Sequence, residues 1–188
     1  MGCLQNGYDP INQYALVSYI PDPLGEFLDR LRVRLAPECR PHAHVTVLPP
    51  RPLQGPVEVA ESELREATSQ FQPFEIQLGD VEMFASTKVI YIEVERGEAE
   101  LRRMHRKLNC GAVLFEEPYD FHPHITLAQS LPPEGVLDSL SLARELWSAW
   151  KDSRTFPVDQ LSFVQNTQQN IWIDLMHVRL DQQLAGIR

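Results

Sequence analysis

The chain has 188 residues, 43% of them apolar and 23% charged, and 17 Lys and Arg against 26 Asp and Glu give a net charge of −9. This composition excludes a mainly disordered chain, and the acidic balance disfavours a long polyanion as an obligate ligand, because such binding needs a basic surface. The chain has no apolar run of about 18 residues and no basic-then-apolar N-terminus, so we expect no membrane span and a cytoplasmic protein. Three scattered cysteines, Cys3, Cys39 and Cys110, predict reduced thiols rather than a disulfide framework.

Strands and helices are predicted to alternate along the chain. In the first half, strands are expected over 14–20, 42–48, 74–84 and 89–95, and amphipathic helices over 24–35 and 57–71. In the second half, strands are expected over 121–128, 156–164 and 171–178, the last two as a hairpin, and helices over 101–108 and 134–151. Pro49-Pro50 is expected to end the strand over 42–48, and Gly79-Asp80 to interrupt the strand over 74–84.

The second half repeats the order of the first. His44 and Thr46 recur as His124 and Thr126, at one common offset along the chain. An apolar strand pattern recurs at the same offset, and both copies shift phase at the same place, as a β-bulge requires. The residues of the first copy are Ile76, Leu78, Val81 and Met83, and their counterparts in the second copy are Phe156, Val158, Leu161 and Phe163. We therefore predict an internal duplication, with chance alignment of common apolar residues as the alternative.

The predicted repeats cover about 12–87 and 88–180 and share the strand near 89–95, which fits both as the last strand of one repeat and as the first of the next. Because repeats that share a strand cannot be two separate domains, we expect one two-lobed domain over 1–188. The predicted fold class is α+β, a bilobal pseudo-twofold duplication of two antiparallel sheets flanked by helices. A central cleft is expected to carry the two His-x-Thr strands.

The candidate catalytic residues lie in two short strands, 42–48 (HAHVTVL) and 122–128 (HPHITLA). Alternate residues of a strand share a face, so the histidine and threonine of each His-x-Thr lie opposite the apolar side chains. A twofold axis would bring two imidazoles and two hydroxyls together. A lone His-x-Thr is more often structural, and the two copies at matching positions indicate a function.

This set of side chains suits phosphodiester chemistry without a metal. Histidine, with an unperturbed pKa of about 6.5, can act as general base for an attacking water or hydroxyl and as general acid for the departing oxygen. Hydroxyl groups can hold the non-bridging oxygens as charge develops on them.

The motifs His44-Val45-Thr46-Val47 and His124-Ile125-Thr126-Leu127 resemble the His-x-Thr/Ser-apolar signature that occurs twice in the two-histidine phosphoesterase superfamily. This superfamily includes the 2′,5′-RNA ligase-like proteins and the cyclic phosphodiesterases, and the resemblance covers roughly residues 12–180. It implies metal-independent hydrolysis or transfer at a 2′,3′-cyclic or 2′,5′ phosphodiester of a nucleotide or RNA end, with no cofactor. It also implies that His44 and His124 are the catalytic pair and that Thr46 and Thr126 bind the phosphate.

The chain departs from that family pattern at one point. Many members of the RNA ligase-like branch have Arg or Lys shortly after the second motif, where this chain has Ala128-Gln129. Arg51, after the first motif, is a candidate to replace that cation. The expected partner is a small nucleotide, a cyclic phosphate or an RNA end, and not a membrane, with the oligomeric state left open.

Two alternatives remain open at this point. His42 and His122 share the faces of His44 and His124, so the four imidazoles are a rival site for Zn, Fe or Ni. Otherwise His42 and His122 lie at the strand entrances, partly solvated. The second alternative is a non-catalytic nucleotide-binding module on the same fold, although binding alone would not require two titratable groups.

Five other features lie outside the two motifs. His105 is expected on the surface of a charged helix, and His177 has no evident partner. The basic cluster Arg102–Lys107 is predicted to be a solvated helix face, with contact to an RNA backbone as the alternative. Tyr91 and Trp172 are candidates to stack on a base or ribose, or to pack under a helix.

Overall fold

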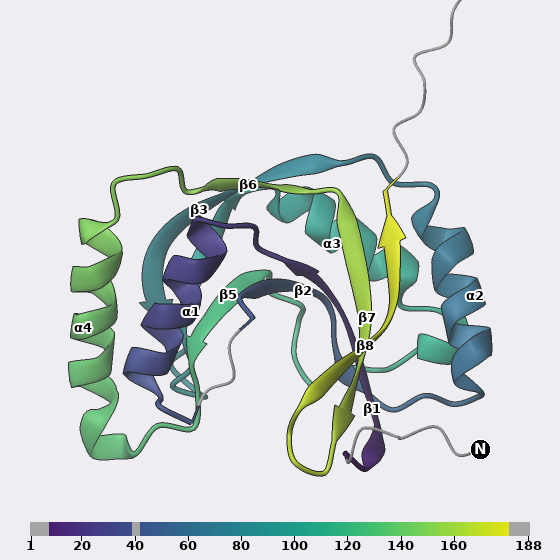
Figure 1. The fold of residues 1–188 in the computed structure, drawn as a ribbon, viewed down its shortest axis with the longest axis horizontal. Coiled ribbons are helices and arrows are strands. Elements are labelled where there is room, and N and C mark those ends of the chain that lie inside the picture. The colour runs from purple at the N-terminus through teal and green to yellow at the C-terminus, as the bar shows by residue number, and fades with distance from the viewer. Residues whose placement is uncertain (1–7, 39–41, 181–188) are drawn as a thin grey trace, which may run out of the picture.

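A computed structural model describes residues 8–38 and 42–180 (Figure 1). Its helices are α1 (Leu24–Leu35), α2 (Val57–Thr68), α3 (Glu98–Leu108) and α4 (Val136–Ala149), with short 3-10 helices η1 (Gly111–Val113) and η2 (Pro133–Gly135). Its strands are β1 (Pro10–Tyr19), β2 (His44–Arg51), β3 (Phe74–Met83), β4 (Ile90–Arg96), β5 (His124–Ala128), β6 (Thr155–Val158), β7 (Gln160–Thr167) and β8 (Trp172–Arg179). Within these ranges no helix is long and apolar enough to cross a membrane.

Two antiparallel four-stranded sheets form the fold. Sheet A has the strand order β2-β1-β7-β8, and sheet B has the order β5-β4-β3-β6. Helix α1 packs against β5 and α4, and helix α3 packs against β2 and α2, so the two lobes use equivalent contacts. In Figure 1, α1 and α4 lie at the left, α2 lies at the right, and β2 and β5 lie between them. The predicted fold class, α+β with two antiparallel sheets flanked by helices, is confirmed.

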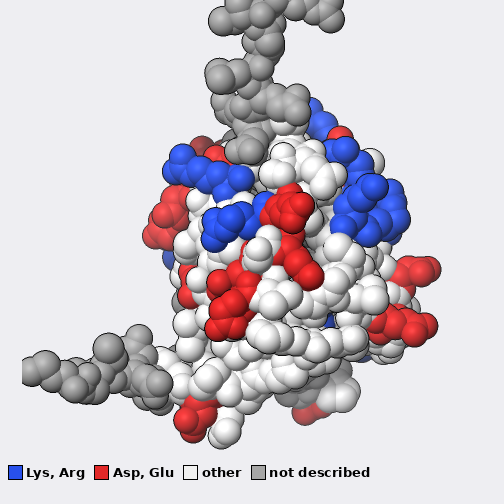
Figure 2. Space-filling view, turned by 90° about the vertical axis from the view of Figure 1, so that its right-hand side faces the viewer, with Lys and Arg blue, Asp and Glu red and all other residues white. Residues whose placement is uncertain are grey.

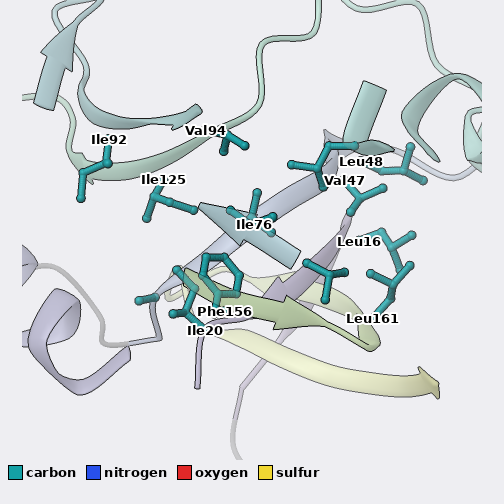
Figure 3. Close-up of a cluster of buried hydrophobic side chains, with 14 of the residues drawn as sticks. Leu16, Ile20, Val47, Leu48, Ile76, Ile92, Val94, Ile125, Phe156 and Leu161 are labelled. Carbon is teal, nitrogen blue, oxygen red and sulfur yellow. The ribbon is translucent and has the colours of Figure 1, made fainter. Parts of the chain in front are cut away.

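Strands β3 and β6 pair in a register that is symmetric about one residue pair. Ile76 lies opposite Phe156, which is its predicted counterpart at the offset that relates the two motifs. The same offset converts the neighbouring pair Glu75–Pro157 into the pair Thr155–Gln77 on the other side. Both central side chains are buried in the hydrophobic core (Figure 3). A local pseudo-twofold axis therefore passes through the Ile76–Phe156 pair.

Strand β4 lies between β5 and β3, just as β1 lies between β2 and β7. Its register on β3 differs from that of β8 on β7, since Ile90 lies opposite Met83 whereas Met176 lies opposite Phe163. The strand near 89–95 was predicted to fit two roles. The neighbours of β4 correspond to those of β1, so they match the role of first strand in a second repeat. The repeat bounds stay a prediction.

The predicted strand over 156–164 is two strands in different sheets. Strand β6 pairs with β3, the chain turns at Asp159, and β7 pairs with β1 and β8. The carbonyl of Asp159 accepts a hydrogen bond from the N–H of Leu180 (2.8 Å), which fixes this crossing. Hydrophobic alternation cannot reveal the change of sheet, because inward-facing apolar residues recur in the chain both before and after Asp159.

Strand β2 continues through Pro49-Pro50 to Arg51, beyond its predicted end. It is an edge strand that pairs only with β1, and a proline there costs no ladder hydrogen bond if its nitrogen faces away from the partner. The predicted alternation is present, because Val45 and Val47 are fully buried while the residue between them is only half-buried. The apolar residues of β5 are buried in the same way, and Figure 3 shows Val47 and Ile125 in the shared core.

Candidate active site

Strands β2 and β5 place the four motif residues outside the hydrophobic core. They are edge strands of different sheets and lie in contact with each other at the middle of the fold (Figure 1). The motif residues on them are all half-buried: His44, Thr46, His124 and Thr126. The structure therefore brings the two predicted motifs to one region, each on the strand face opposite its buried apolar residues.

Both motif histidines are held by the same hydrogen bond. Nδ1 of His44 lies 2.7 Å from the carbonyl oxygen of His42, and Nδ1 of His124 lies 2.6 Å from the carbonyl oxygen of His122. Because a carbonyl only accepts, Nδ1 carries the proton in both rings. Each Nε2 is then an acceptor with no protein partner among the described residues. Sequence reasoning assigned His42 and His122 by their side chains and missed this role of their carbonyls.

The surroundings of both rings favour the neutral form. The pKa of His44 is lowered to about 4, chiefly by burial and also by the charges of Arg32 and His42. The hydrogen bond to the carbonyl of His42 and the charge of Asp29 oppose that shift. Burial also lowers the pKa of His124, opposed by its bond to the carbonyl of His122. Both rings are therefore neutral in the free protein at pH 7.

The entrance to the first motif is fixed from α1. Oδ1 of Asp29 accepts a hydrogen bond from the N–H of His42 (2.7 Å). His42 has a φ of +121°, a backbone conformation that side-chain-bearing residues rarely adopt. The carboxylate of Asp29 thus stabilises the conformation that presents the carbonyl of His42 to the ring of His44.

The entrance to the second motif is fixed from α3 by a group of opposite charge. The guanidinium of Arg102 donates to the carbonyl of Phe121, the residue before His122, and pairs with Glu98 at 2.7 Å. Arg102 was predicted as part of a solvated helix face. Its side chain instead ties α3 to the chain that leads into His124.

An aromatic and acidic pair lies beside the first motif. Tyr19 is the cross-strand neighbour of His44, and its ring centroid lies 4.8 Å from that of His42 and 6.5 Å from that of His44. The hydroxyl of Tyr19 donates to Oδ1 of Asp174 (2.6 Å). Burial, followed by Asp174, raises the pKa of Tyr19. Nothing in the sequence pattern indicated this pair, because it joins β1 to β8.

The second motif has a different aromatic neighbour. Tyr91 lies opposite Thr126 in the ladder, stacks on Phe84 at 4.1 Å and meets the His124 ring at 5.3 Å. Trp172 is half-buried against the small apolar cluster that includes Val17. Both aromatic residues thus have packing partners, and stacking on a base or ribose stays a prediction.

Arg51 does not face the site. It is 2% exposed, and its guanidinium donates to Asn109 Oδ1 (2.7 Å), to the carbonyl of Val113 (3.2 Å) and to Glu117 Oε1 (2.5 Å). Burial lowers its pKa, and Glu117 opposes that shift. The suggestion that Arg51 replaces the missing cation is therefore wrong, because its guanidinium is buried and hydrogen-bonded to the segment that follows α3.

Two other histidines differ from their predictions. His105 is 9% exposed rather than on the surface, since it stacks on Phe121 at 3.9 Å and its Nδ1 lies 2.9 Å from the carbonyl of Val47. The apolar face of α3 is wider than its leucines alone indicate. His177, which had no evident partner, lies 2.9 Å from the hydroxyl of Ser162.

The rest of the basic cluster is a mixed surface. The guanidinium of Arg103 lies over the ring of Phe71 at 5.0 Å, and Arg106 and Lys107 are exposed. Figure 2 shows one face of the molecule, on which Lys and Arg are interspersed with Asp and Glu. This face offers no continuous basic track for a nucleic-acid backbone.

The rival metal site lacks a ligand cluster. Among residues 8–38 and 42–180, no group of three or more His, Cys, Asp or Glu side chains is placed to hold a metal ion. The ring centroids of His122 and His124 lie 6.1 Å apart. Cys110 is exposed and free, whereas Cys3 and Cys39 lie outside the described residues.

Comparison with known proteins agrees with this architecture. The model of the 2′-5′ RNA ligase superfamily matches residues 20–170. A predicted phosphoesterase of Bacillus licheniformis is 29% identical over 137 residues, which cover 68% of this chain and 77% of that protein. The crystal structure of E. coli LigT complexed with phosphate matches 93% of this chain and 100% of LigT, with a TM-score of 0.62 and 15% identity. Kluyveromyces marxianus Usb1 matches 87% of this chain and 97% of its own, with a TM-score of 0.50 and 11% identity.

Proposed function

The chain belongs to the 2′-5′ RNA ligase superfamily of two-histidine phosphoesterases, and on that premise we propose that it hydrolyses, or reversibly transfers at, a 2′,3′-cyclic or 2′,5′ phosphodiester of a nucleotide or RNA end. One observation carries the proposal. His44 and His124 each donate Nδ1–H to the carbonyl two residues earlier, which leaves both Nε2 atoms available to a substrate. Two free ring nitrogens on matched strands are what an acid–base pair requires.

His44 is the general base in this proposal. Its Nε2 takes the proton of the attacking water or ribose hydroxyl as the oxygen of that group bonds to phosphorus. The low pKa of His44, about 4, keeps Nε2 unprotonated at neutral pH. Because Nδ1 already donates to a carbonyl, the ring cannot turn to present the wrong nitrogen without breaking that bond.

His124 is the general acid. Its protonated Nε2 gives a proton to the oxygen that leaves phosphorus on the opposite side from the attack. Burial lowers the pKa of His124 in the free protein, and the negative charge of a bound diester favours the protonated form. Proton exchange with water then restores both rings.

Thr46 and Thr126 are proposed to bind the non-bridging oxygens. Each threonine follows its histidine by two residues and shares its strand face, so its hydroxyl points to the same side as the ring. A hydroxyl that donates to oxygens on which charge develops stabilises the transition state more than the ground state, so it lowers the barrier.

Two further observations support the substrate class and the absence of a metal step. LigT has been crystallised with phosphate, ATP, NADP+ and 3′-AMP, so a protein of this fold accepts small nucleotides. In the described part of this chain, the carboxylates of Asp29 and Asp174 near the first motif belong to no group of three or more His, Cys, Asp or Glu side chains placed to hold a metal ion.

A turnover assay tests the proposal. A panel of 2′,3′-cyclic nucleotides, ADP-ribose cyclic phosphate and 2′,5′-dinucleotides is incubated with the protein, with and without EDTA. We expect at least one diester to be cleaved at the same rate in both conditions. Binding without cleavage would instead identify a non-catalytic nucleotide-binding module. Loss of activity in EDTA with recovery on Zn or Mn would identify the four-histidine metal site.

A further inference from the structure

A cavity of about 380 Å³ lies in sheet A beside the first motif. It opens where β1 and β7 separate, because their pairing ends at Val17 and Ser162 and the chain leaves the sheet at Asp159 to form β6. Tyr19, Gln160 and Arg179 are among the residues that line it. The size falls within the range of about 300–1,000 Å³ that is usual for small-molecule sites.

Tyr19 connects the cavity to the first motif, because it lines the cavity and lies beside His44. Cross-strand partners share a sheet face, and Tyr19 is the partner of His44 while Gln160 is the partner of Arg179. Arg179 on β8 is three strands from His44, so a spacing of about 4.8 Å between paired strands gives roughly 14 Å between backbones, and the separation of β1 from β7 makes the span at least that long. An arginine side chain covers part of that span, which leaves room for about one nucleotide unit.

Arg179 is the charged group that this cavity offers to an anion. Its side chain is exposed, and its guanidinium forms no hydrogen bond or ion pair within the described part of the chain. By contrast, Arg51 and Arg102 are committed to protein groups. A free guanidinium binds phosphate through two parallel N–H donors.

The rest of the lining suits a nucleotide better than a bare anion. Gln160 supplies an amide that can both donate and accept, and Asp159 supplies a carboxylate. A carboxylate repels a free inorganic anion but accepts hydrogen bonds from ribose hydroxyls. The combination of one guanidinium, one amide and one carboxylate therefore fits a sugar with its phosphate.

We propose that this cavity is a subsite for a second phosphate of the substrate, one nucleotide unit from the phosphodiester at His44 and His124, with Arg179 as its ligand. This inference rests on the proposed function, since it extends the same site. It makes the preferred substrate a short nucleotide with a phosphate beyond the scissile one. It also supplies, from the far edge of sheet A, a cation that the sequence lacks after the second motif.

Kinetics with three matched substrates test the subsite. The first is 2′,5′-linked diadenylate, and the other two are the same compound with one terminal phosphate, at one end or at the other. We expect the wild-type protein to prefer one phosphorylated form by about tenfold in kcat/KM. Arg179→Gln should abolish this preference, and Gln160→Trp, which fills the cavity, should abolish it too. Arg34→Gln removes an exposed arginine of α1 and should retain it. An unchanged preference in Arg179→Gln, or no preference in the wild-type protein, would overturn the proposal.

Direct binding separates failure of the subsite from failure of the proposed function. Calorimetry measures the Kd of diadenylate and of its two phosphorylated forms for the His124→Ala protein, with and without Arg179→Gln. If none of these compounds is cleaved by the wild-type protein, a roughly tenfold weaker Kd of one phosphorylated form in Arg179→Gln still upholds the subsite. Equal Kd values in the two proteins reject it, whatever the catalytic outcome.

Discussion

The two motif regions use one geometry with opposite supports. In each, Nδ1 of the second histidine bonds to the carbonyl of the first. Asp29 on α1 and Arg102 on α3 occupy corresponding positions. Asp29 follows the buried Leu28 and Arg102 follows the buried Leu101, and the helical pattern of Leu28, Leu31 and Leu35 recurs as Leu101, Met104 and Leu108. Asp29 accepts from the N–H of His42, whereas Arg102 donates to the carbonyl before His122.

Other parts of the surroundings make the two identical side chains unequal in this nearly symmetric fold, since the charge of Asp29 opposes the downward shift of the His44 pKa and Arg102 is not a cause of the His124 shift. A base and an acid need different proton affinities, and surroundings rather than residue type set them. The first ring carries the larger shift, to a pKa of about 4, with burial and the charge of Arg32 among its causes. The second ring has burial and His122 as its acidifying causes. The hydrogen bond to the carbonyl keeps the geometry equal while the charges differ.

The largest expected effect is loss of either ring. His44→Ala and His124→Ala should each lower kcat by about 10²–10⁴-fold, because each removes one proton-transfer group. The double variant should be little worse than the worse single variant, since the two act as a unit. Steady-state rates on the best substrate of the panel measure this. Near-normal turnover in either single variant would contradict the assignment of that histidine.

Loss of a motif hydroxyl should have the next largest effect. Thr46→Val and Thr126→Val keep the side-chain shape and should raise the barrier by up to ~3–4 kcal/mol if each hydroxyl acts like an oxyanion donor. The two variants should be similarly impaired while circular dichroism stays that of the wild type. A variant that unfolds would show that its threonine is a structural hydrogen-bonding residue instead.

The supports at the strand entrances should matter less. Asp29→Ala leaves the N–H of His42 unpaired and should lower kcat about tenfold, comparable to the cost of one lost hydrogen bond of about 1–1.5 kcal/mol. Asp29→Asn keeps an acceptor and should recover part of the rate. Because the charge of Asp29 raises the pKa of His44, Asn should also move the acidic limb of the pH profile to lower pH.

Arg102→Met provides the same test for the second motif, and Arg106→Met is its control on an exposed arginine of the same helix. We expect a loss of a few-fold to tenfold in kcat for the first variant and none for the second. Equal rates in both would show that the contact to Phe121 does not position His124.

A separate effect concerns the stability of the fold against pH rather than turnover. The folded pKa of His44, about 4, lies below the unfolded value of about 6.5, so the unfolded state binds a proton first as pH falls. The stabilisation is present above pH 6.5 and is lost between about pH 6.5 and 4. The urea midpoint should therefore fall less over this range in His44→Gln than in the wild type. Parallel curves for the two proteins would contradict the burial of this ring.

The fold and the motif residues could be predicted because both depend on patterns within single strands. The offset between the two motifs recurs in the pairing of Ile76 with Phe156, and alternation placed Val45 and Val47 in the core. The change of sheet at Asp159 was missed, because a strand that passes from one sheet to another keeps its apolar period.

The supporting groups of the site could not be predicted, because they come from contacts between elements. Asp29 lies 13 residues before His42 and Arg102 lies 19 before Phe121, and their residue types differ. A comparison of the two repeats looks for similar residues, so it does not match the carboxylate of Asp29 with the guanidinium of Arg102. Arg51 was misassigned for the same reason, since its partners on the segment after α3 are known only from the fold.

The central claim is that both rings carry the proton on Nδ1 and leave Nε2 free, and side-chain ¹⁵N–¹H NMR measures this directly. Spectra of the free protein at pH 7, assigned with His44→Gln and His124→Gln, should show both rings neutral with the proton on Nδ1. A neutral His44 ring with its proton on Nε2 would contradict the account, because that nitrogen could then not accept a proton from the attacking group. The same tautomer at His124 would contradict the hydrogen bond from its Nδ1 to the carbonyl of His122.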